Sequence, residues 1–324
     1  RDISRWQGVD KILVRDFGGI AAELQPQFAD VEFVTFTSTA EAIRHADGAD
    51  AIIGTCDAEL LDAAADVIWV QVFAAGVDRC MPAEAIRSGR VVLTNMQKMS
   101  SPVLAEHAIT MVMSLARGLV AHGKLMQTGE WRRGGPETAR MESLAGKTLL
   151  VVGLGGIGTE VAKRGAALGM RVTGTRRSSR EGPDFVDYVG LSDELFELAA
   201  DANFIVNALP LTEETTGIFD AGFFEAARDG AYFVSIGRGA STVTDDLVAA
   251  LDSGKIAGAG LDVTDPEPLP SDHVLWQMQN VIITPHIGGA GGNRDRHIVL
   301  LKENLRRFIA GEALYNVVDP AKGY

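Results

Sequence analysis

The segment KTLLVVGLGGIGTEVAKRGAALG, residues 147–169, decides the fold, because it combines a strand, a glycine-rich turn and an amphipathic helix. Each glycine has a mechanical role. Gly153 permits the tight turn, Gly155 lets the backbone approach a pyrophosphate, and Gly158 allows close packing of helix on strand. Free amides and the dipole at the helix start favour negative charge. The segment therefore predicts a dinucleotide site, and the alternative is a purely structural glycine turn.

Apolar runs alternate with helical stretches on both sides of this segment. Strands that are apolar on both faces and separated by helices are typical of a parallel sheet covered on both sides. The fold class is therefore α/β, with two doubly wound parallel-sheet domains. The first series of expected strands covers residues 11–16, 31–36, 51–55, 67–73 and 91–95, and the second covers 147–153, 170–175, 203–210, 231–237, 256–263 and 281–285.

Two helices are expected outside the alternating series. Residues 101–126 predict one long helix with Ser101 as N-cap and Pro102 at the first helical position. Its apolar residues surround nearly the whole circumference, which indicates burial between domains or in a subunit interface. We expect a homodimer through this helix. Residues 293–310 predict an amphipathic helix that returns to pack on the first domain.

The composition excludes several classes of protein. A chain of 324 residues with 46% hydrophobic content can bury two cores. A net charge of -13 and a pI near 4.9 argue against nucleic acid or an anionic membrane surface as partner. No apolar run approaches the roughly 20 residues that cross a bilayer. We expect neither a disulfide framework nor a metal site from Cys56 and Cys80, which suits a reducing cytoplasm.

The residues after the strand at 170–175 bear on the choice of coenzyme. An acidic residue there would bind the ribose 2'-hydroxyl of NAD, but this run contains no carboxylate. Guanidiniums and hydroxyls in a row match the charge and geometry of a 2'-phosphate. The run therefore predicts NADPH as the preferred coenzyme, with NADH possible, and the alternative is a solvated basic loop. Its residues are Thr175, Arg176, Arg177, Ser178, Ser179 and Arg180.

Polar residues also stand at the carboxyl ends of three later strands, the edge where an open α/β sheet binds ligands. They are Arg238, Asp262, Glu267 and His286. Seven motifs follow one another along nearly the whole chain: AAGVD at 74–78, AEHA at 105–108, GLGGIG at 153–158, LPLTEETTG at 209–217, IGRG at 236–239, LDVTDPEPLP at 261–270 and PHIGG at 285–289. With these motifs the chain resembles the D-isomer-specific 2-hydroxyacid dehydrogenases, which include glyoxylate and hydroxypyruvate reductases.

This resemblance implies both architecture and reaction. It implies a flavodoxin-like substrate domain from residues 1–100 and 291–324, and an inserted Rossmann NAD(P)-binding domain over 101–290. The implied activity is reduction of a small 2-keto acid to the D-2-hydroxy acid, or the reverse reaction. An alternative is a dinucleotide-sensing regulatory protein, since transcriptional corepressors resemble this fold and its catalytic triad. A third possibility is a related reaction on another anion, such as oxidation of phosphite.

The resemblance also implies roles for the polar residues. Arg238 would bind the substrate carboxylate and polarise the keto oxygen. His286 would be the general acid, and Glu267 would hydrogen-bond the imidazole and favour its charged form. Asp262 would face the nicotinamide carboxamide, or instead brace the strand end. The whole set expected at the dinucleotide is Gly153, Leu154, Gly155, Gly156, Ile157, Gly158, Arg176, Arg177, Ser178, Leu209, Pro210, Thr215, Ile236, Gly237, Asp262, His286 and Gly288.

Some details depart from the family pattern or bear on the substrate. The backbone amides of Ala75, Gly76 and Val77 would form a carboxylate cradle. Glutamate at 267, where formate dehydrogenases of the superfamily have glutamine, argues for a hydroxy-acid substrate. The loop MQKMSSPVL at 96–104 lacks the Pro-Gly pair of many relatives. Its Met96 and Met99 either widen the pocket or pack in the core. Trp131 either reaches a neighbouring subunit's site or is buried at an interface.

Overall fold

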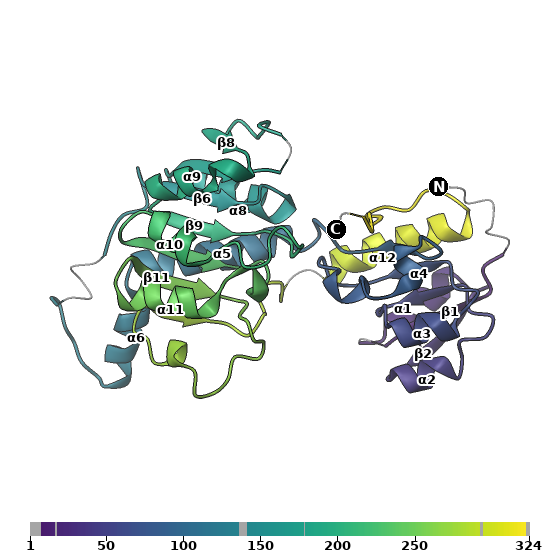
Figure 1. The fold of residues 1–324 in the computed structure, drawn as a ribbon. Helices are drawn as coiled ribbons and strands as arrows, with labels where there is room; N and C mark the ends of the chain where they lie inside the picture. The colour runs from purple at the N-terminus through teal and green to yellow at the C-terminus, as the bar shows by residue number, and fades with distance from the viewer. Residues whose placement is uncertain (1–7, 17, 136–140, 178, 292–293, 322–324) are drawn as a thin grey trace. The chain divides into compact units, whose positions relative to one another are not determined.

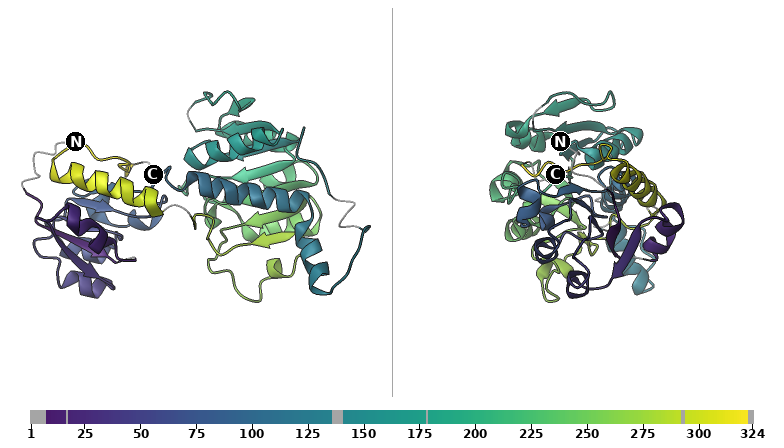
Figure 2. Two further views of the ribbon diagram at one scale, coloured as in Figure 1. Left: turned by 180° about the vertical axis from the view of Figure 1, so that it is seen from behind. Right: turned by 90° about the vertical axis from the view of Figure 1, so that its right-hand side faces the viewer.

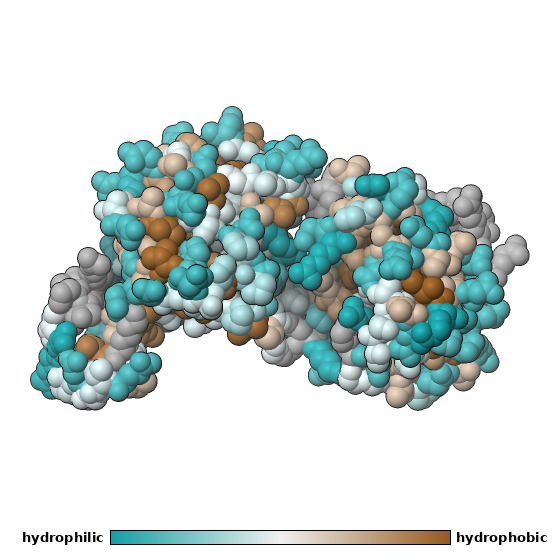
Figure 3. All heavy atoms as spheres, turned by 60° about the horizontal axis from the view of Figure 1, so that its bottom comes forward, coloured by the Kyte–Doolittle hydropathy of each residue, from teal (hydrophilic) through white to brown (hydrophobic). Residues whose placement is uncertain are grey.

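The computed structural model describes residues 8–16, 18–135, 141–177, 179–291 and 294–321 (Figure 1). The chain forms two compact units. We call Arg1–Met99 with Gly292–Tyr324 the terminal unit, and Ser100–Gly291 the inserted unit. On the face drawn in Figure 3, hydrophilic side chains predominate and apolar ones gather in smaller groups.

The terminal unit contains a five-stranded parallel sheet in the order β2-β1-β3-β4-β5, which is the flavodoxin-like order. All five strands predicted in this part of the chain are confirmed. The strands are β1 (Lys11–Arg15), β2 (Glu32–Phe36), β3 (Ala51–Ile53), β4 (Trp69–Gln71) and β5 (Val92–Thr94). The helical segments are α1 (Ile20–Leu24), η1 (Gln25–Gln27), α2 (Thr39–Ile43), α3 (Ala58–Ala63), η2 (Asp78–Cys80), α4 (Glu84–Arg87) and α12 (Arg294–Ile309).

Successive residues of a strand point into two different hydrophobic cores, one on each face of the sheet, because side chains alternate between the faces. Leu13 and Ile52 point into a core with α2, α3 and α4, whereas their neighbours Ile12 and Ile53 point into a core with α1 and α12. The yellow helix α12 therefore lies on the same sheet as the N-terminal strands (Figure 1). The prediction that the last helix returns to the first domain is confirmed.

A buried polar network ties α12 to this sheet. The Asn304 side chain is fully buried, and its Nδ2 donates to Gln71 Oε1 at 3.0 Å. Thr94 Oγ1 lies 2.8 Å from Gln71 Oε1 and accepts from Trp69 Nε1 at 2.8 Å. Asn304 Oδ1 also accepts from the Tyr315 amide at 2.8 Å. The network fixes the helix and the segment after it against β4 and β5.

The inserted unit contains a seven-stranded parallel sheet in the order β12-β11-β10-β9-β6-β7-β8. Six of these strands extend from β8 to β11 in the order of a Rossmann fold, and β12 adds a seventh. The predicted fold class of two doubly wound α/β domains is confirmed. The strands are β6 (Thr148–Val152), β7 (Arg171–Thr175), β8 (Tyr188–Gly190), β9 (Phe204–Asn207), β10 (Ala231–Ser235), β11 (Ile256–Leu261) and β12 (Val281–Ile283).

Helices cover both faces of this sheet. Figure 2 shows α5 (Ser101–Ala116) across one face, where it packs with α8 (Gly156–Ala167) over Leu149 and Val151. On the opposite face, Leu150 and Val152 pack in a core with α9 (Leu195–Asp201), α10 (Ala221–Ala226) and α11 (Thr244–Asp252). The remaining helical segments of the unit are α6 (Leu119–Gln127), η3 (Ser192–Glu194), η4 (Gly239–Ser241) and η5 (Val274–Trp276).

The prediction of one long helix over 101–126 is wrong. The structure has α5 and α6 instead, bent by 78° at Arg117 and Gly118. Gly118 adopts a left-handed φ of 61°, which ends one helix and starts the next. Helix α5 begins at Ser101, so its N-cap is Ser100, one residue earlier than predicted. In the described chain no single helix is long and apolar enough to span a membrane, whereas the bent pair α5 and α6 passes that test by length and composition.

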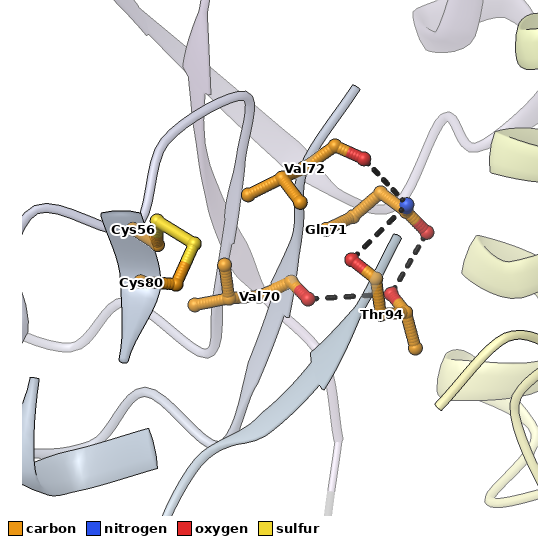
Figure 4. The surroundings of a disulfide bond; sticks show 6 residues. All are labelled: Cys56, Val70, Gln71, Val72, Cys80 and Thr94. Carbon is orange, nitrogen blue, oxygen red and sulfur yellow. Dashed lines mark hydrogen bonds between the residues drawn. A yellow bond between two sulfur atoms is a disulfide. The ribbon is translucent and has the colours of Figure 1, made fainter. Parts of the chain in front are cut away.

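The prediction that the cysteines form no disulfide is also wrong, because the structure joins Cys56 to Cys80 (Figure 4). The two residues follow the carboxyl ends of the adjacent strands β3 and β4, which brings their Cα atoms to 5.3 Å. That distance lies in the range that a disulfide requires. A separation of 24 residues in the sequence gives no sign of this proximity. The cysteines therefore no longer support a reducing cytoplasm.

Candidate active site

The glycine-rich turn after β6 has three glycines with three different surroundings. Gly153 adopts a φ of 95°, and a Cβ atom there would lie 2.9 Å from the Leu209 side chain. A Cβ at Gly158 would lie 2.0 Å from the Gly153 carbonyl oxygen, so this contact requires glycine. A Cβ at Gly155 would meet no atom within 4 Å. Gly155 thus leaves open space at the point where the sequence predicts a pyrophosphate.

The start of α8 provides the donors for such an anion. The helix begins at Gly156, and its N-cap Gly155 has no side chain to accept from the first amides. The first amides of a helix have no intrahelical acceptor, so they are available to an anion. The turn is also tied to the end of β7, since the amides of Gly153 and Leu154 donate to Thr175 Oγ1 and Thr175 O, at 3.1 and 2.9 Å.

Arg176 follows Thr175 directly and has an unsatisfied group. Its Nε atom is buried and has no hydrogen-bond partner. A buried guanidinium nitrogen without an acceptor is costly, and a phosphate oxygen would satisfy it. The structure therefore places an orphaned donor beside the end of β7, where the 2'-phosphate of NADP is predicted.

The other two arginines of the basic run lie near carboxylates of the protein. Arg177 Nη1 lies 3.7 Å from Glu214 Oε2, in a weak ion pair. Arg180 Nη1 pairs with Glu194 Oε2 at 2.6 Å and donates to the Tyr188 hydroxyl oxygen at 2.8 Å. Arg180 thus already has a carboxylate partner within the protein. Ser178, which the sequence also assigns to the coenzyme, lies outside the described residues.

The loops after β9 and β10 bring together further residues of the predicted dinucleotide site. Thr215 Oγ1 donates to the Pro210 carbonyl oxygen at 2.7 Å, which folds the loop at 209–217 back on itself. A Cβ at Gly237 would lie 2.7 Å from the Leu209 carbonyl oxygen, so the two loops touch through their backbones. Ile236, one residue earlier, is buried in the core beside them.

Arg238 lies directly after β10, on a backbone shaped by its neighbours. Its carbonyl oxygen accepts from Ser241 Oγ at 2.6 Å, and its Nη1 donates to the Gly237 carbonyl oxygen at 2.9 Å. A Cβ at Gly239 would lie 1.8 Å from the Thr264 carbonyl oxygen. Glycine at 239 therefore lets the Arg238 loop pass the loop after β11 at backbone contact distance.

His286 and Glu267 form the pair that the resemblance implies. His286 Nδ1 lies 2.6 Å from Glu267 Oε1, and 41% of the histidine side chain and 38% of the glutamate side chain remain exposed. Because a carboxylate accepts, Nδ1 is the donor, and Nε2 is the ring nitrogen left for a substrate. His286 adopts a φ of 55°, which is uncommon for a residue with a side chain. Such backbone outliers cluster at active sites.

Asp262 is the buried group that shapes the His286 loop. Its side chain is 1% exposed. Oδ1 accepts from Thr284 Oγ1 at 2.6 Å and from the Ile287 amide at 2.9 Å, and Oδ2 accepts from the Gly288 amide at 2.8 Å. The Asp262 carbonyl oxygen accepts from the His286 amide at 2.8 Å. Asp262 therefore braces the loop on both sides of His286, and its contact with a nicotinamide stays a prediction.

Two residues of this network were missed as site residues by the sequence analysis. His107 Nε2 lies 2.9 Å from Thr284 Oγ1 and 3.4 Å from Asp262 Oδ1. Because the Thr284 hydroxyl gives its one proton to Asp262, we assign His107 Nε2 as the donor to Thr284. The signal that points to His107 is its place in the AEHA motif at 105–108.

The predicted carboxylate cradle belongs to the terminal unit. Ala75, Gly76 and Val77 follow the carboxyl end of β4, and Asn95 Nδ2 donates to the Ala75 carbonyl oxygen at 2.7 Å. Met96 is fully buried and Met99 packs against the same core, which favours a packing role for both. Trp131 is 89% exposed in the single chain.

Comparisons with known proteins identify the family of this chain. Residues 109–288 match the family model described as D-isomer specific 2-hydroxyacid dehydrogenase, NAD binding domain. The chain is 35% identical over 269 residues to a glyoxylate reductase of Thermococcus kodakarensis, which covers 81% of this chain and 80% of the relative. It is 34% identical over 265 residues to a human glyoxylate reductase/hydroxypyruvate reductase, covering 80% of this chain and 79% of that protein.

The fold is also similar to solved structures. One is a crystal structure of an NADPH-dependent glyoxylate/hydroxypyruvate reductase from Sinorhizobium meliloti in complex with NADP and sulfate. It has a TM-score of 0.84 and 27% identity, and it covers 97% of this chain and 100% of the other. A glyoxylate reductase with the source given as Paecilomyes thermophila has a TM-score of 0.85 and 25% identity, covering 97% of this chain and 100% of the other.

Proposed function

This chain belongs to the D-isomer-specific 2-hydroxyacid dehydrogenase family, and from that premise we propose that it reduces small 2-keto acids to D-2-hydroxy acids with NADPH. It is an NAD(P)-dependent 2-hydroxyacid dehydrogenase, and its glyoxylate and hydroxypyruvate reductase relatives support a 2-keto acid reductase. The observation that carries the mechanism is the 2.6 Å contact between His286 Nδ1 and Glu267 Oε1 at the carboxyl edge of the inserted sheet.

The residues of the inserted unit fit a nicotinamide dinucleotide with a 2'-phosphate. The open space at Gly155 and the first amides of α8 suit the pyrophosphate. The orphaned Nε of Arg176 suits the 2'-phosphate, with Arg177 beside it in the sequence. When bound, the dihydronicotinamide supplies the hydride that reduces the keto carbon. The relative from Sinorhizobium meliloti, crystallised with NADP, supports this preference.

Arg238 fixes and polarises the substrate. Its planar guanidinium binds a carboxylate in a bidentate manner and stabilises negative charge that develops on the keto oxygen. The backbone amides of Ala75, Gly76 and Val77, which belong to the terminal unit, are proposed to bind a carboxylate. Local donors of this kind would let a chain with a net charge of -13 capture an anion.

His286 moves the proton. Glu267 holds Nδ1, so Nε2 donates the proton to the keto oxygen. In the oxidative direction Nε2 accepts that proton from the hydroxyl. Asp262 and Thr284 are proposed as positioning residues, because their hydrogen bonds hold the loop that carries His286.

A direct absorbance assay of coenzyme oxidation tests the proposed activity. Purified protein is mixed with NADPH or NADH and with glyoxylate, hydroxypyruvate, pyruvate, phenylpyruvate or a branched 2-keto acid. We expect oxidation of NADPH with glyoxylate or hydroxypyruvate, and a kcat/KM with NADPH about tenfold or more above that with NADH. Binding of dinucleotide without turnover on any keto acid would contradict the proposal and favour the regulatory alternative.

The coenzyme preference has its own matched variants. Arg176→Asp combined with Arg177→Ala is expected to remove the preference for NADPH, because it replaces the proposed 2'-phosphate ligands by a negative charge. Arg180→Ala is the control, since Arg180 already pairs with Glu194, and it should keep the preference. Retention of the NADPH preference in the double variant would refute the assignment.

We also propose a homodimer through the helices α5 and α6. Several large apolar side chains on them remain exposed in the single chain, namely Met113 at 43%, Leu119 at 56% and Met126 at 78%. Exposed apolar groups of this kind mark association surfaces. Light scattering at several protein concentrations tests the mass in solution. A monomer at all of them would refute the dimer.

A further inference from the structure

The Cys56–Cys80 disulfide lies next to the predicted carboxylate cradle. Cys80 ends η2 and stands three residues after Val77, the last residue of the cradle. Its side chain is 3% exposed, and its amide donates to the Val77 carbonyl oxygen at 2.8 Å. Figure 4 shows the disulfide on the side of β4 that carries Val70 and Val72, away from the hydrogen bonds between Gln71 and Thr94. The disulfide therefore restrains the loop at 75–80. It lies on the other side of β4 from the buried polar network of Gln71 and Thr94.

The partner Cys56 stands on a firmly held segment. Two residues before it, the Gly54 amide donates to the Gln71 carbonyl oxygen at 2.8 Å. One residue after it, Asp57 Oδ2 accepts from Thr39 Oγ1 at 2.6 Å. Hydrogen bonds to β4 before Cys56 and to α2 after it thus hold this segment, so the disulfide ties Cys80 to a hydrogen-bonded anchor.

The start of the loop has a separate attachment. The Met96 amide donates to the Ala74 carbonyl oxygen at 3.0 Å, and Asn95 Nδ2 donates to the Ala75 carbonyl oxygen at 2.7 Å. The disulfide lies at the other end of the loop, after Val77. The backbone amides of the cradle therefore lie between hydrogen bonds to the end of β5 and a covalent tie to the end of β3.

We propose that the Cys56–Cys80 disulfide is a redox-sensitive positioning element for the carboxylate of the keto acid. This inference rests on the proposed function, because it assumes that the loop at 75–77 binds that carboxylate. A dithiol reductant reduces the S–S bond with two electrons and two protons, which gives the thiols of Cys56 and Cys80 and the cyclic disulfide of the reductant. Reduction frees the Cys80 end of the loop and lowers affinity for the keto acid.

The effect should separate by unit. Arg238, Glu267 and His286 and the dinucleotide turn all belong to the inserted unit, whereas the disulfide belongs to the terminal unit. Reduction should therefore raise KM for glyoxylate about tenfold, well below the hundredfold that a 1 Å misplacement of reacting groups can cost. The affinity for NADPH should stay the same, and kcat should change less than KM.

The experiment compares oxidised and dithiothreitol-reduced full-length wild type. KM and kcat for glyoxylate are measured with NADPH, and the Kd of NADPH is measured by its fluorescence. Alkylation of free thiols followed by intact mass reports the state of the two cysteines in each sample. The matched control is the Cys56→Ser, Cys80→Ser variant, whose KM should equal that of reduced wild type and should not respond to the reductant.

Each outcome decides the inference. A higher KM on reduction in wild type alone, with an unchanged Kd for NADPH, supports it. Equal KM values in the two redox states overturn it while leaving the proposed function intact, and so do free thiols in the unreduced protein. If the double variant does not fold, the wild-type comparison alone still decides. NADPH binding without keto acid turnover in either state overturns the proposed function, and the inference with it.

Discussion

The two units of this protein use the same all-parallel architecture but employ their buried polar groups for different ends. In the inserted unit, the buried carboxylate of Asp262 accepts from residues on both sides of His286, so it holds the loop of the proposed proton donor in place. In the terminal unit, buried Gln71 and Asn304 bond to each other and attach the last helix. One network holds the loop of the proposed proton donor, and the other attaches α12 to the sheet. Variants in each unit should therefore change different measurements.

The largest expected effect is on turnover in the inserted unit. Arg238→Ala should lower kcat/KM for glyoxylate by about 10³-fold, because it removes both the carboxylate ligand and a preorganised charge. The midpoint of thermal unfolding should hardly move. Arg171→Ala, an exposed arginine of the same unit paired with Asp201, is the control and should retain full activity. Similar losses of kcat/KM in both variants would show that Arg238 has no special role at the sheet edge.

Two glycines of the same turn should differ in effect, one on stability and the other on coenzyme binding. Gly158→Ala should lower the free energy of unfolding by about 3 kcal/mol, since its Cβ would lie 2.0 Å from the Gly153 carbonyl oxygen. Gly155→Ala should leave that free energy within about 0.5 kcal/mol of wild type and raise the Kd of NADPH at least ~tenfold. Urea unfolding and NADPH fluorescence measure the two quantities. Unchanged NADPH affinity in Gly155→Ala would contradict the pyrophosphate assignment.

The polar network of the terminal unit should affect stability alone. Asn304→Ala removes one hydrogen bond from Gln71 Oε1 and leaves the Tyr315 amide without its acceptor, so the free energy of unfolding should fall by about 2 kcal/mol. The kcat of the folded fraction should remain that of wild type. Val299→Ala on the same helix, at a position 68% exposed, should change neither quantity. A large loss of kcat in Asn304→Ala would show that this network serves the chemistry as well.

The smallest expected effect comes from a surface ion-pair cluster on α12. Hydrogen bonds from Arg306 and then Arg307 lower the pKa of Glu303 from 4.5 to about 2. A carboxylate whose pKa is lowered on folding adds stability above its unfolded pKa and loses it as the pH falls toward the folded one. Glu303→Gln should therefore be slightly less stable than wild type at pH 7, because exposed pairs contribute little. The difference should shrink between about pH 4.5 and about pH 2, as urea unfolding can measure. A difference independent of pH would show that charge is not its cause.

The sequence predicts most strands because each is a short apolar run that a doubly wound sheet buries on both faces. It misses β8, whose three residues include an exposed Tyr188 and resemble a loop. It also merges α5 and α6, because the pattern of apolar residues continues across Gly118 while the backbone there turns sharply. Local pattern therefore predicts which segments are regular, but not where a single left-handed residue redirects them.

The site shows the same limit at longer range. Motifs at strand ends are enough to predict Glu267 and His286, and the structure brings these two together. The contact between His107 and Thr284 joins residues 177 positions apart, and the AEHA motif marks His107 without indicating Thr284 as its partner. The Cys56–Cys80 bond likewise depends on the adjacency of β3 and β4. Contacts made by sheet order become visible only once the order of the strands is known.

A paired measurement on His286→Asn tests the proposed proton transfer. We expect kcat for glyoxylate to fall by about 10³-fold, because the proton donor is lost, while the Kd of NADPH stays within about twofold of wild type. Turnover close to that of wild type, with NADPH still bound normally, would contradict the claim that the His286 and Glu267 pair carries the reaction.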